Sequence, residues 1–376
     1  MKKVALLLAA AMLALAGCAS AGDTAAASDA APAESTAESA AAEDSTEAAL
    51  PGEPHPLSAY SACAVSGSSV YTAVSHFSSS EDSLGSFDHS TVYKTDLTTG
   101  QTYEMYRTGS QLASAPLIID DTLYFICYDG GMLALPTTGG EARVLPFSYD
   151  DWMPVFYAGH YLYCRSVSAA PFCRTGGMRF NLENGETAPW NIPVETMYIP
   201  DVVGDALLLC RVVSDYPVPY PDDDEMSQAL LQNTTLEYTL ADPATGAVRQ
   251  TCFTLPYDIP QPGNLTVYTY LGKCGSDFYF RADQCDDEYA LVSQSVLRIG
   301  TDGTRTDLGI TKTPDYLDYC AVLQGDEVRW LLTRGPDGIY LIYDTQGNEI
   351  GRNKRPAGLE AFFPLCMLDD GRLLMV

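Results

Sequence analysis

Acidic and aromatic residues stand side by side at several points of the chain. They do so in "SYDDWM" (148–153), "ETMY" (195–198), "TPDYLDY" (313–319) and "LEAFF" (359–363). An aromatic ring stacks on a cation or on the apolar face of a sugar, and a carboxylate accepts hydrogen bonds from hydroxyl and ammonium groups. This combination indicates binding of a sugar or of a cationic peptide.

Three long polar segments add further acids. They are "FSSSEDSLGSFDHS" (77–90), "VSDYPVPYPDDDEMSQALLQN" (213–233) and "DQCDDEYALVSQ" (283–294). Because binding residues concentrate on long loops over a rigid scaffold, we select the ligand-binding candidates from these segments and from the acidic and aromatic pairs. The candidates are Asp150, Asp151, Trp152, Tyr198, Asp222, Asp223, Asp224, Asp286, Asp287 and Tyr316.

Two groups of residues offer ligands to a metal ion. The run 222–225 supplies hard oxygens for calcium, but consecutive residues point in different directions and the spaced EF-hand pattern is absent. His76 and His89 flank one long segment and would bind a metal with Asp88 if the three met. We therefore predict no cofactor, keep calcium as the open alternative, and assign no metal ligands.

The sequence holds no linear catalytic motif. G-x-S-x-G, H-E-x-x-H, the P-loop and G-x-G-x-x-G are all absent, and only four histidines occur. A carboxylate glycosidase or a tyrosine-dependent lyase needs no linear motif, so catalysis on a glycan stays open as the alternative to binding. We assign no catalytic residue.

Short apolar runs separated by tight turns must position these residues. One kind of turn, a Gly or Asp pair, precedes an aromatic run, as in "DDTLYFIC" (120–127) and "GSDFYFRA" (275–282). A second kind closes the following run, as in "LTTGQT" (97–102) and "TQGNEI" (345–350). The two kinds alternate along the chain. Gly and Asp supply the positive φ of tight hairpins, so the alternation predicts repeats of four antiparallel strands, A to D.

The repeats predict an all-β fold, a β-propeller with six complete four-stranded blades and a partial seventh. The blades begin near residues 61, 115, 153, 199, 267 and 319, and "FFPLCMLDDGRLLMV" (362–376) supplies two strands of the seventh. Either residues 57–60 pair with this last blade or the ring keeps one incomplete blade. A pair of β-sandwiches is the alternative architecture, and 224–232 is the one expected helix.

Strand direction assigns the long segments to one face. In an antiparallel repeat the B to C and D to A connections emerge at one end, and the A to B and C to D turns at the other. All the long segments are B to C connections, and the acidic and aromatic pairs lie in D to A connections. We therefore expect an acidic, aromatic long-loop face opposite a tight-turn face.

The repeats resemble the bacterial TolB-like and quinoprotein-like propellers and, more loosely, the YWTD-type propellers. The resemblance covers about residues 57–376 and is carried by segments such as "YKTDLTTGQ" (93–101), "YTLADPATGA" (238–247) and "IYDTQGNEI" (342–350). It implies the propeller fold. Quinoprotein enzymes also bind a quinone through metal ligands and tryptophans, but Trp152, Trp190 and Trp330 form no matching cluster, so neither cofactor nor activity is implied here.

The first residues resemble a bacterial lipoprotein signal. Lys2 and Lys3 precede an apolar stretch too short to span a bilayer, and "LAGC" (15–18) matches the family's cleavage and acylation pattern. The resemblance implies a signal peptide at 1–17 and a lipid on Cys18, which would anchor the protein to a membrane outside the cytoplasm. An ordinary secretory signal with a chance cysteine is the alternative.

Residues 18–54 read as a disordered acidic tether and 55–376 as the propeller domain. Residues 19–54 hold eight acids and no Lys, Arg or aromatic residue, so they cannot bury enough apolar surface to fold. Residues 55–376 still carry a net charge of about −22, with 41 of the 49 acids and 19 of the 21 Lys and Arg residues. This charge excludes nucleic acid as a partner and favours a cell-surface glycan, peptide or protein.

The ten cysteines after Cys18 show no framework spacing and favour buried free thiols over disulfides.

Overall fold

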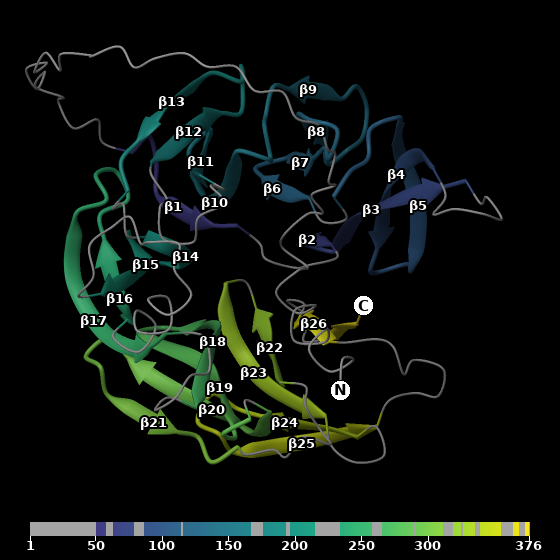
Figure 1. Ribbon diagram of the computed structural model, residues 1–376. Helices are drawn as coiled ribbons and strands as arrows, with labels where there is room; N and C mark the ends of the chain where they lie inside the picture. Colours follow the sequence, from purple (N-terminus) through teal and green to yellow (C-terminus); the bar gives the residue numbers. More distant parts are fainter. Residues whose placement is uncertain are drawn as a thin grey trace, which may run out of the picture. The chain divides into compact units, whose positions relative to one another are not determined.

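The computed structural model describes residues 50–57, 63–78, 86–113, 116–166, 176–192, 196–214, 234–257, 265–288, 290–310, 319–324, 326–334, 339–354, 364–367 and 373–375. Over these ranges the chain forms strands and turns and no helix (Figure 1). No helix of the described chain therefore has the length and hydrophobicity needed to cross a bilayer. The helix expected at 224–232 lies outside the described residues.

Six successive groups of four strands make up the described domain. The first two groups are β2 (Ala64–Ser66), β3 (Ser69–Phe77), β4 (Phe87–Asp96), β5 (Gln101–Thr108), and β6 (Leu117–Ile119), β7 (Thr122–Ile126), β8 (Met132–Pro136), β9 (Arg143–Leu145). The third and fourth are β10 (Trp152–Ala158), β11 (Tyr161–Ser166), β12 (Gly177–Asn181), β13 (Thr187–Trp190), and β14 (Thr196–Val203), β15 (Ala206–Ser214), β16 (Thr234–Ala241), β17 (Val248–Pro256). The fifth and sixth are β18 (Thr266–Cys274), β19 (Asp277–Cys285), β20 (Leu291–Gly300), β21 (Arg305–Asp307), and β22 (Tyr319–Gln324), β23 (Glu327–Arg334), β24 (Ile339–Tyr343), β25 (Glu349–Lys354). Two further pieces are β1 (Pro54–Pro56) and the hairpin β26 (Pro364–Met367), β27 (Leu373–Met375).

Within each group the strands pair in chain order and antiparallel, which confirms the predicted four-stranded repeat. The first, second and fourth repeats are separate four-stranded sheets, and β1 adds a fifth strand to the third. The fifth and sixth repeats join where β18 meets β23 in parallel at Lys273 and Glu327. Hairpin β26–β27 joins the same sheet through β22, at Leu323 and Cys366. No described strand links this hairpin to the first repeat, so ring closure and the blade count stay predictions.

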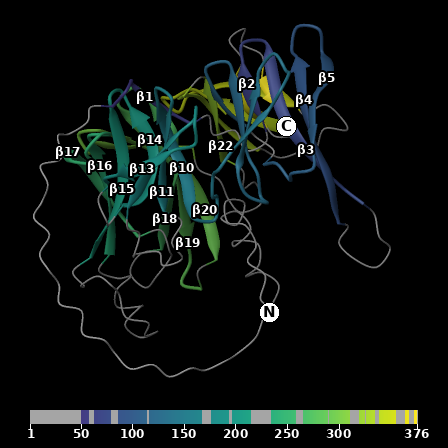
Figure 2. The ribbon, with the colours of Figure 1, turned by 90° about the horizontal axis from the view of Figure 1, so that it is seen from above.

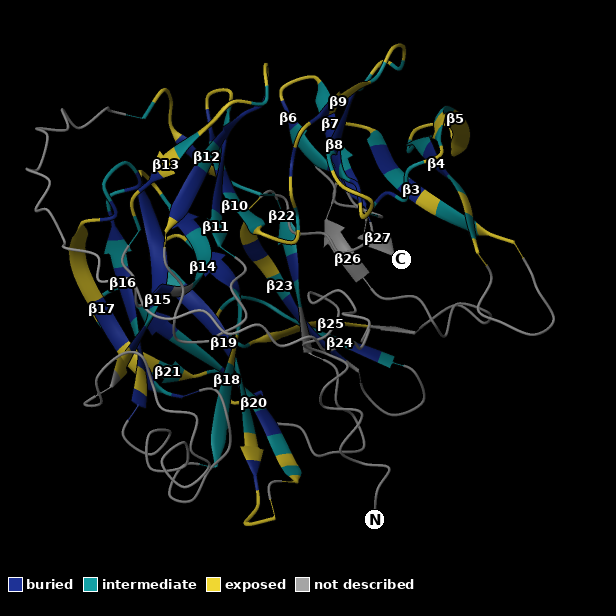
Figure 3. Cartoon of the chain, turned by 45° about the horizontal axis from the view of Figure 1, so that its top comes forward, coloured by how far each residue is buried: buried dark blue, intermediate teal, exposed yellow. Residues whose placement is uncertain are grey.

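The middle strands of the repeats are buried on both faces because they serve two cores. In β19, Phe278 and Phe280 pack against the fourth repeat, whereas Tyr279 packs against the sixth. Successive side chains of a strand point to opposite faces, so consecutive residues must be apolar where a strand lies between two cores. This explains the unbroken apolar runs of the sequence. Figure 3 shows the same contrast, with buried middle strands and exposed residues along β5 and β17.

Consecutive repeats pack against each other through these cores (Figures 1 and 2). Val92 of the first repeat shares a cluster with Phe125 of the second, and Met132 of the second shares one with Phe180 of the third. The same arrangement joins the third repeat to the fourth, the fourth to the fifth and the fifth to the sixth. Stacking of each sheet on the next therefore holds the domain together.

The described cysteines follow the predicted thiol chemistry. Cys127, Cys164, Cys252, Cys274 and Cys285 are free, and all except Cys274 are buried. Burial raises the pKa of the Cys164 thiol well above its ordinary value. These residues therefore act as small apolar side chains of the cores.

A short side-chain motif fixes the turns between strands C and D. Asp96, Asn181, Asp242 and Asp344 each accept two backbone N–H bonds, at 2.7 to 3.3 Å, from residues two to four positions further along the chain. A Gly at positive φ closes each turn, for example Gly246 at 71°. An Asx turn followed by Gly needs only these two residue types, which is why the sequence pattern identifies these turns well.

Strand β1 ties the segment before the repeats to the third repeat. It pairs antiparallel with β10, and it brings Leu50 against the core between the third and fourth repeats and Leu57 against the core between the second and third. Pro54 and Pro56 have no N–H to donate, so this segment suits an edge position only. Residue 57 forms no strand, and residues 58–60, expected to close the ring, lie outside the described residues.

Removal of this segment should destabilise the domain. A protein that lacks residues 1–57 loses the partial burial of two leucines and the β1 pairing, so its free energy of unfolding should fall by about 2–4 kcal/mol relative to a protein lacking residues 1–46. Urea unfolding of both proteins measures the difference. Equal stabilities would show that β1 contributes nothing to the fold.

Candidate functional site

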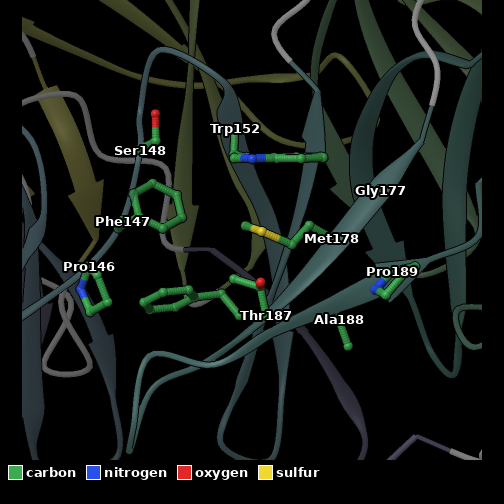
Figure 4. A pocket seen from close by; sticks show the side chains of 10 residues that line it. Pro146, Phe147, Ser148, Trp152, Gly177, Met178, Thr187, Ala188 and Pro189 are labelled. Carbon is green, nitrogen blue, oxygen red and sulfur yellow. The ribbon is translucent and has the colours of Figure 1, made fainter.

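A pocket of about 400 Å³ opens between the second and third repeats (Figure 4). It is lined by Pro146, Phe147, Ser148, Trp152, Gly177, Met178, Phe180, Thr187, Ala188 and Pro189. Its walls come from the connection that follows β9, from the start of β10 and β12, and from β13. Trp152 and Gly177 stand at the end of the third repeat where the D to A and B to C connections emerge, which is the predicted long-loop face. Thr187 follows the C to D turn at the other end, so the pocket extends along the outer strand of this repeat.

The connection from β9 to β10 holds Trp152 at the pocket by local hydrogen bonds. The Phe147 carbonyl accepts from Gly131 N at 2.7 Å, and the buried Phe147 ring meets Phe180 edge to face at 5.2 Å. The Ser148 carbonyl then accepts from Trp152 N at 3.1 Å, and the Ser148 hydroxyl donates to the Asp151 carboxylate at 2.7 Å. This turn leaves the Trp152 side chain half-buried at the start of β10, where it faces Met178.

Acids and tyrosines stand beside the pocket. Asp150 and Asp151 are exposed in the same connection, and Asp129 is exposed in the turn between β7 and β8. Tyr149 lies edge to face with the exposed Tyr128, with ring centroids 6.4 Å apart. Burial, and then the neighbouring Tyr128, raises the pKa of Tyr149. Tyr149 therefore stays neutral at pH 7, and the two rings offer a π surface next to three carboxylates.

The wall of the pocket is mostly apolar. Only Ser148 and Thr187 bring side-chain hydroxyls to it, and the other lining side chains are aromatic, proline, methionine or alanine. Arg165 lies one strand away, opposite both Met153 and Gly177, and its Nη2 contacts the Met153 sulfur at 3.2 Å. The arrangement can take up an apolar group and place a cation over the nearby carboxylates and rings.

The structure brings together three of the predicted site residues, Asp150, Asp151 and Trp152. Tyr198 instead packs on the core between the fourth and fifth repeats, where its hydroxyl is 2.5 Å from that of Tyr238. Asp286 accepts N–H bonds from Glu288 and Ala290, both at 2.9 Å, and so shapes the connection between β19 and β20 next to the exposed Asp287. The predicted residues Cys18, Asp222, Asp223, Asp224 and Tyr316 lie outside the described residues.

His76 and His89 do meet, as the sequence suggested for a metal site. They face each other across β3 and β4 with ring centroids 4.3 Å apart, and His89 Nδ1 is 2.9 Å from the Asp88 carboxylate. Asp88 thus contacts one histidine from the side. In the part of the chain that the structure describes, no three His, Cys, Asp or Glu side chains gather closely enough to hold a metal ion.

A buried polar cluster, absent from the sequence predictions, ties three repeats together. Tyr270 donates to Asp201 Oδ2 at 2.7 Å, and Lys273 Nζ lies 2.6 Å from Asp326 Oδ2 and 3.9 Å from Asp201 Oδ1. The Lys273 and Asp201 side chains are only 6% and 9% exposed. Burial raises the pKa of Asp201, and the bond from Tyr270 and the charge of Lys273 partly oppose that rise. Burial likewise raises the pKa of Tyr270 well above its ordinary value, and the nearby Asp201 adds to the rise.

One signal in the sequence could have pointed to this cluster. Asp201 and Lys273 each stand near the end of an A strand, just before the turn to strand B. A charge inside a strand that is otherwise apolar needs a partner. The pattern could not show that the two charges come from adjacent repeats.

Comparison with known proteins gives a likeness of fold at low similarity. No protein-family model matches the chain, and no curated protein matches it. Among solved structures, an oligogalacturonate lyase from Vibrio parahaemolyticus is similar at 12% identity and a TM-score of 0.41, with 75% of each chain covered. BamB from Moraxella catarrhalis is similar at 10% identity and a TM-score of 0.39, with 83% of this chain and 89% of that one covered.

An oligogalacturonate lyase in complex with manganese is also similar, at 12% identity and a TM-score of 0.42, with 82% of this chain and 86% of that one covered. Because every one of these TM-scores is below 0.5, we base no argument on these likenesses. The strand pairings of the chain itself define an all-β protein built of four-stranded antiparallel repeats.

Proposed function

We propose that this protein is a lipid-anchored extracytoplasmic binding module. Its repeats would close into a β-propeller, whose acidic and aromatic long-loop face binds a glycan, peptide or protein partner. The pocket beside Trp152 is the observation that carries the proposal, because it combines a concave apolar wall with exposed carboxylates and a pair of tyrosine rings. Ligand sites of proteins have this composition and this range of volumes.

A binding screen tests the role of this face. The ligands are immobilised N-acetylglucosamine oligomers, peptidoglycan fragments and basic peptides, and the variants are Trp152→Ala and the double variant Asp150→Asn, Asp151→Asn. We expect each to weaken binding at least tenfold with little change in melting temperature, since these side chains are exposed or half-exposed. Glu186→Gln, exposed in the C to D turn of the same repeat, serves as the control. Equal losses of binding in all three variants would contradict a special role for this face.

The proposed anchor has its own test. Cys18→Ser should move the protein from the membrane fraction to the soluble fraction, because attachment of the lipid to this side chain needs the sulfur atom. Labelling with a tagged fatty acid should mark the natural protein and leave the variant unmarked. Membrane retention of both proteins without label on either would contradict the anchor.

The alternative is a propeller-type glycan-processing enzyme, and one observation favours it. Asp201, Tyr270 and Lys273 are the kind of convergent acid, tyrosine and cation that a carboxylate glycosidase or a tyrosine-dependent lyase uses. However, each of these groups already contacts another member of the cluster, and only Asp326 is well exposed, at 51%. Product release from oligosaccharides that disappears in Tyr270→Phe, with the fold intact, would establish the enzyme.

A further inference from the structure

We propose that the pocket beside Trp152 selects a peptide in which an apolar side chain is flanked by Lys or Arg. The inference rests on the proposed binding role of this face and names its ligand class. It follows from two properties of the site, the chemistry of the pocket wall and the distribution of charge around it.

The pocket wall suits a hydrocarbon side chain better than a sugar. A sugar ring brings several hydroxyls, and each hydroxyl that is buried without a hydrogen-bond partner weakens binding. The lining side chains offer the Ser148 and Thr187 hydroxyls and the Trp152 Nε1–H, and Ser148 already donates to Asp151. A leucine or phenylalanine side chain has no such requirement. It would contact Trp152 and Met178 on entering the pocket.

The surroundings of the pocket suit a cation. Asp150 and Asp151 are exposed within two residues of Trp152, and Asp129 is exposed beside the Tyr128 and Tyr149 pair. The cations around the pocket are engaged elsewhere: Arg165 contacts the Met153 sulfur, Arg143 donates to the Glu183 carbonyl, and Arg179 lies over the Tyr161 ring. A Lys or Arg next to the apolar residue would therefore meet carboxylates and ring faces, both of which attract a cation. An acidic peptide would meet repulsion from the same carboxylates and from the net charge of −28.

Four soluble probes test the ligand class. Fluorescently labelled Lys-Lys-Leu-Lys-Lys, Lys-Lys-Ser-Lys-Lys and Glu-Glu-Leu-Glu-Glu are titrated with the natural protein, together with labelled chitotetraose. We expect the leucine peptide to bind at least tenfold more tightly than the serine peptide, which corresponds to burial of one leucine side chain. The glutamate peptide and the sugar should not bind. Affinity for the leucine peptide should fall as the ionic strength rises.

Two variants connect this discrimination with the pocket. Trp152→Ala removes a wall, and Thr187→Trp fills the pocket from β13, where Thr187 is exposed and shares the face of Phe180, without removing any core side chain. Both should reduce the leucine to serine ratio to about one. If Trp152→Ala fails to fold, the Thr187→Trp result decides.

The outcomes separate this inference from the proposed function. Equal binding of the leucine and serine peptides would overturn the inference, because the acids alone would then hold the ligand. Binding of chitotetraose that depends on Trp152, without peptide binding, would overturn the inference and leave the binding face in place. Binding of no probe by the natural protein would count against both.

Discussion

Replacing Lys273 with methionine should lower the free energy of unfolding by about 3–5 kcal/mol, because it leaves a buried carboxylate without its cation. Asp201 is 9% exposed, and its closest remaining partner in the cluster would be the Tyr270 hydroxyl. Methionine keeps the length and the apolar packing of the lysine side chain, so the loss reports mainly the charge. Urea unfolding at pH 7 measures it. A loss below about 1 kcal/mol would show that the cluster contributes little to the stability of the fold.

The pH dependence of this variant has a defined sign. Burial raises the pKa of Asp201 in the folded protein above the ordinary value of 3.8. A carboxyl group with a raised folded pKa contributes stability that is fully present below its unfolded pKa and is lost as the pH rises through the folded pKa. Without Lys273 this folded pKa should rise further. The deficit of the variant relative to the natural protein should therefore shrink as the pH falls from 7 toward 4.

Two companion variants isolate the pair. Lys273→Met combined with Asp201→Asn should recover much of the lost stability, because an amide at position 201 leaves no buried charge without a partner. Arg107→Met is the matched control at the surface. Its side chain and that of its partner Glu104 are 56% and 45% exposed, so removal of that ion pair should change stability by less than about 1 kcal/mol.

The sequence predicted the repeated strands and turns of the described domain because local chemistry specifies them. Gly at positive φ and an Asx side chain define a turn by themselves, as at Asp242 and Gly246. The two-sided burial of strands such as β8 also follows from their unbroken apolar runs. The predicted repeat starts near 115, 153 and 267 lie within two residues of Leu117, Trp152 and Thr266, where strands begin.

Contacts between distant segments could not be predicted in this way. The pairing of β1 with β10 is carried by the segment "PHP", which has none of the β-branched or aromatic residues typical of a strand. The Asp201 and Lys273 contact joins two repeats, and no local pattern encodes which repeats are neighbours.

The same contrast between local features and distant contacts applies to the candidate site. Asp150, Asp151 and Trp152 are adjacent in sequence, so they stay together in any fold. Tyr198 looked equivalent in the sequence, but it packs against Tyr238 in a core. The strand pairing of β14 is irregular on both sides of Tyr198. Met178, on another strand, completes the pocket. The apolar pattern around it in the sequence identifies it as a strand residue and does not show that it lines a pocket. Sequence reasoning therefore finds a site where its residues are local and misses the parts that come from another strand.

Gly177 should be the least replaceable residue of the pocket wall. A Cβ atom at this position would lie 2.4 Å from Cε3 of Trp190 and 2.8 Å from its carbonyl oxygen. The indole has little room to retreat, because its Nε1 donates to the Pro243 carbonyl at 2.8 Å and its rings pack on Phe156 and Tyr163. Gly177→Ala should therefore lower the free energy of unfolding by about 2–4 kcal/mol, near the upper end of the costs of overpacking.

A double-mutant cycle shows where that cost arises. Trp190→Phe removes the second ring of the indole, which includes Cε3, so it should relieve part of the strain of Gly177→Ala, and the two changes should couple by about 1 kcal/mol or more. Gly109→Ala is the control, since a Cβ atom there would meet nothing within 4 Å. Additive losses in the cycle would place the strain at the backbone of β13. Coupled losses would show that the Trp190 ring sets the space behind the pocket, so that the pocket depends on a core side chain that a ligand need not touch.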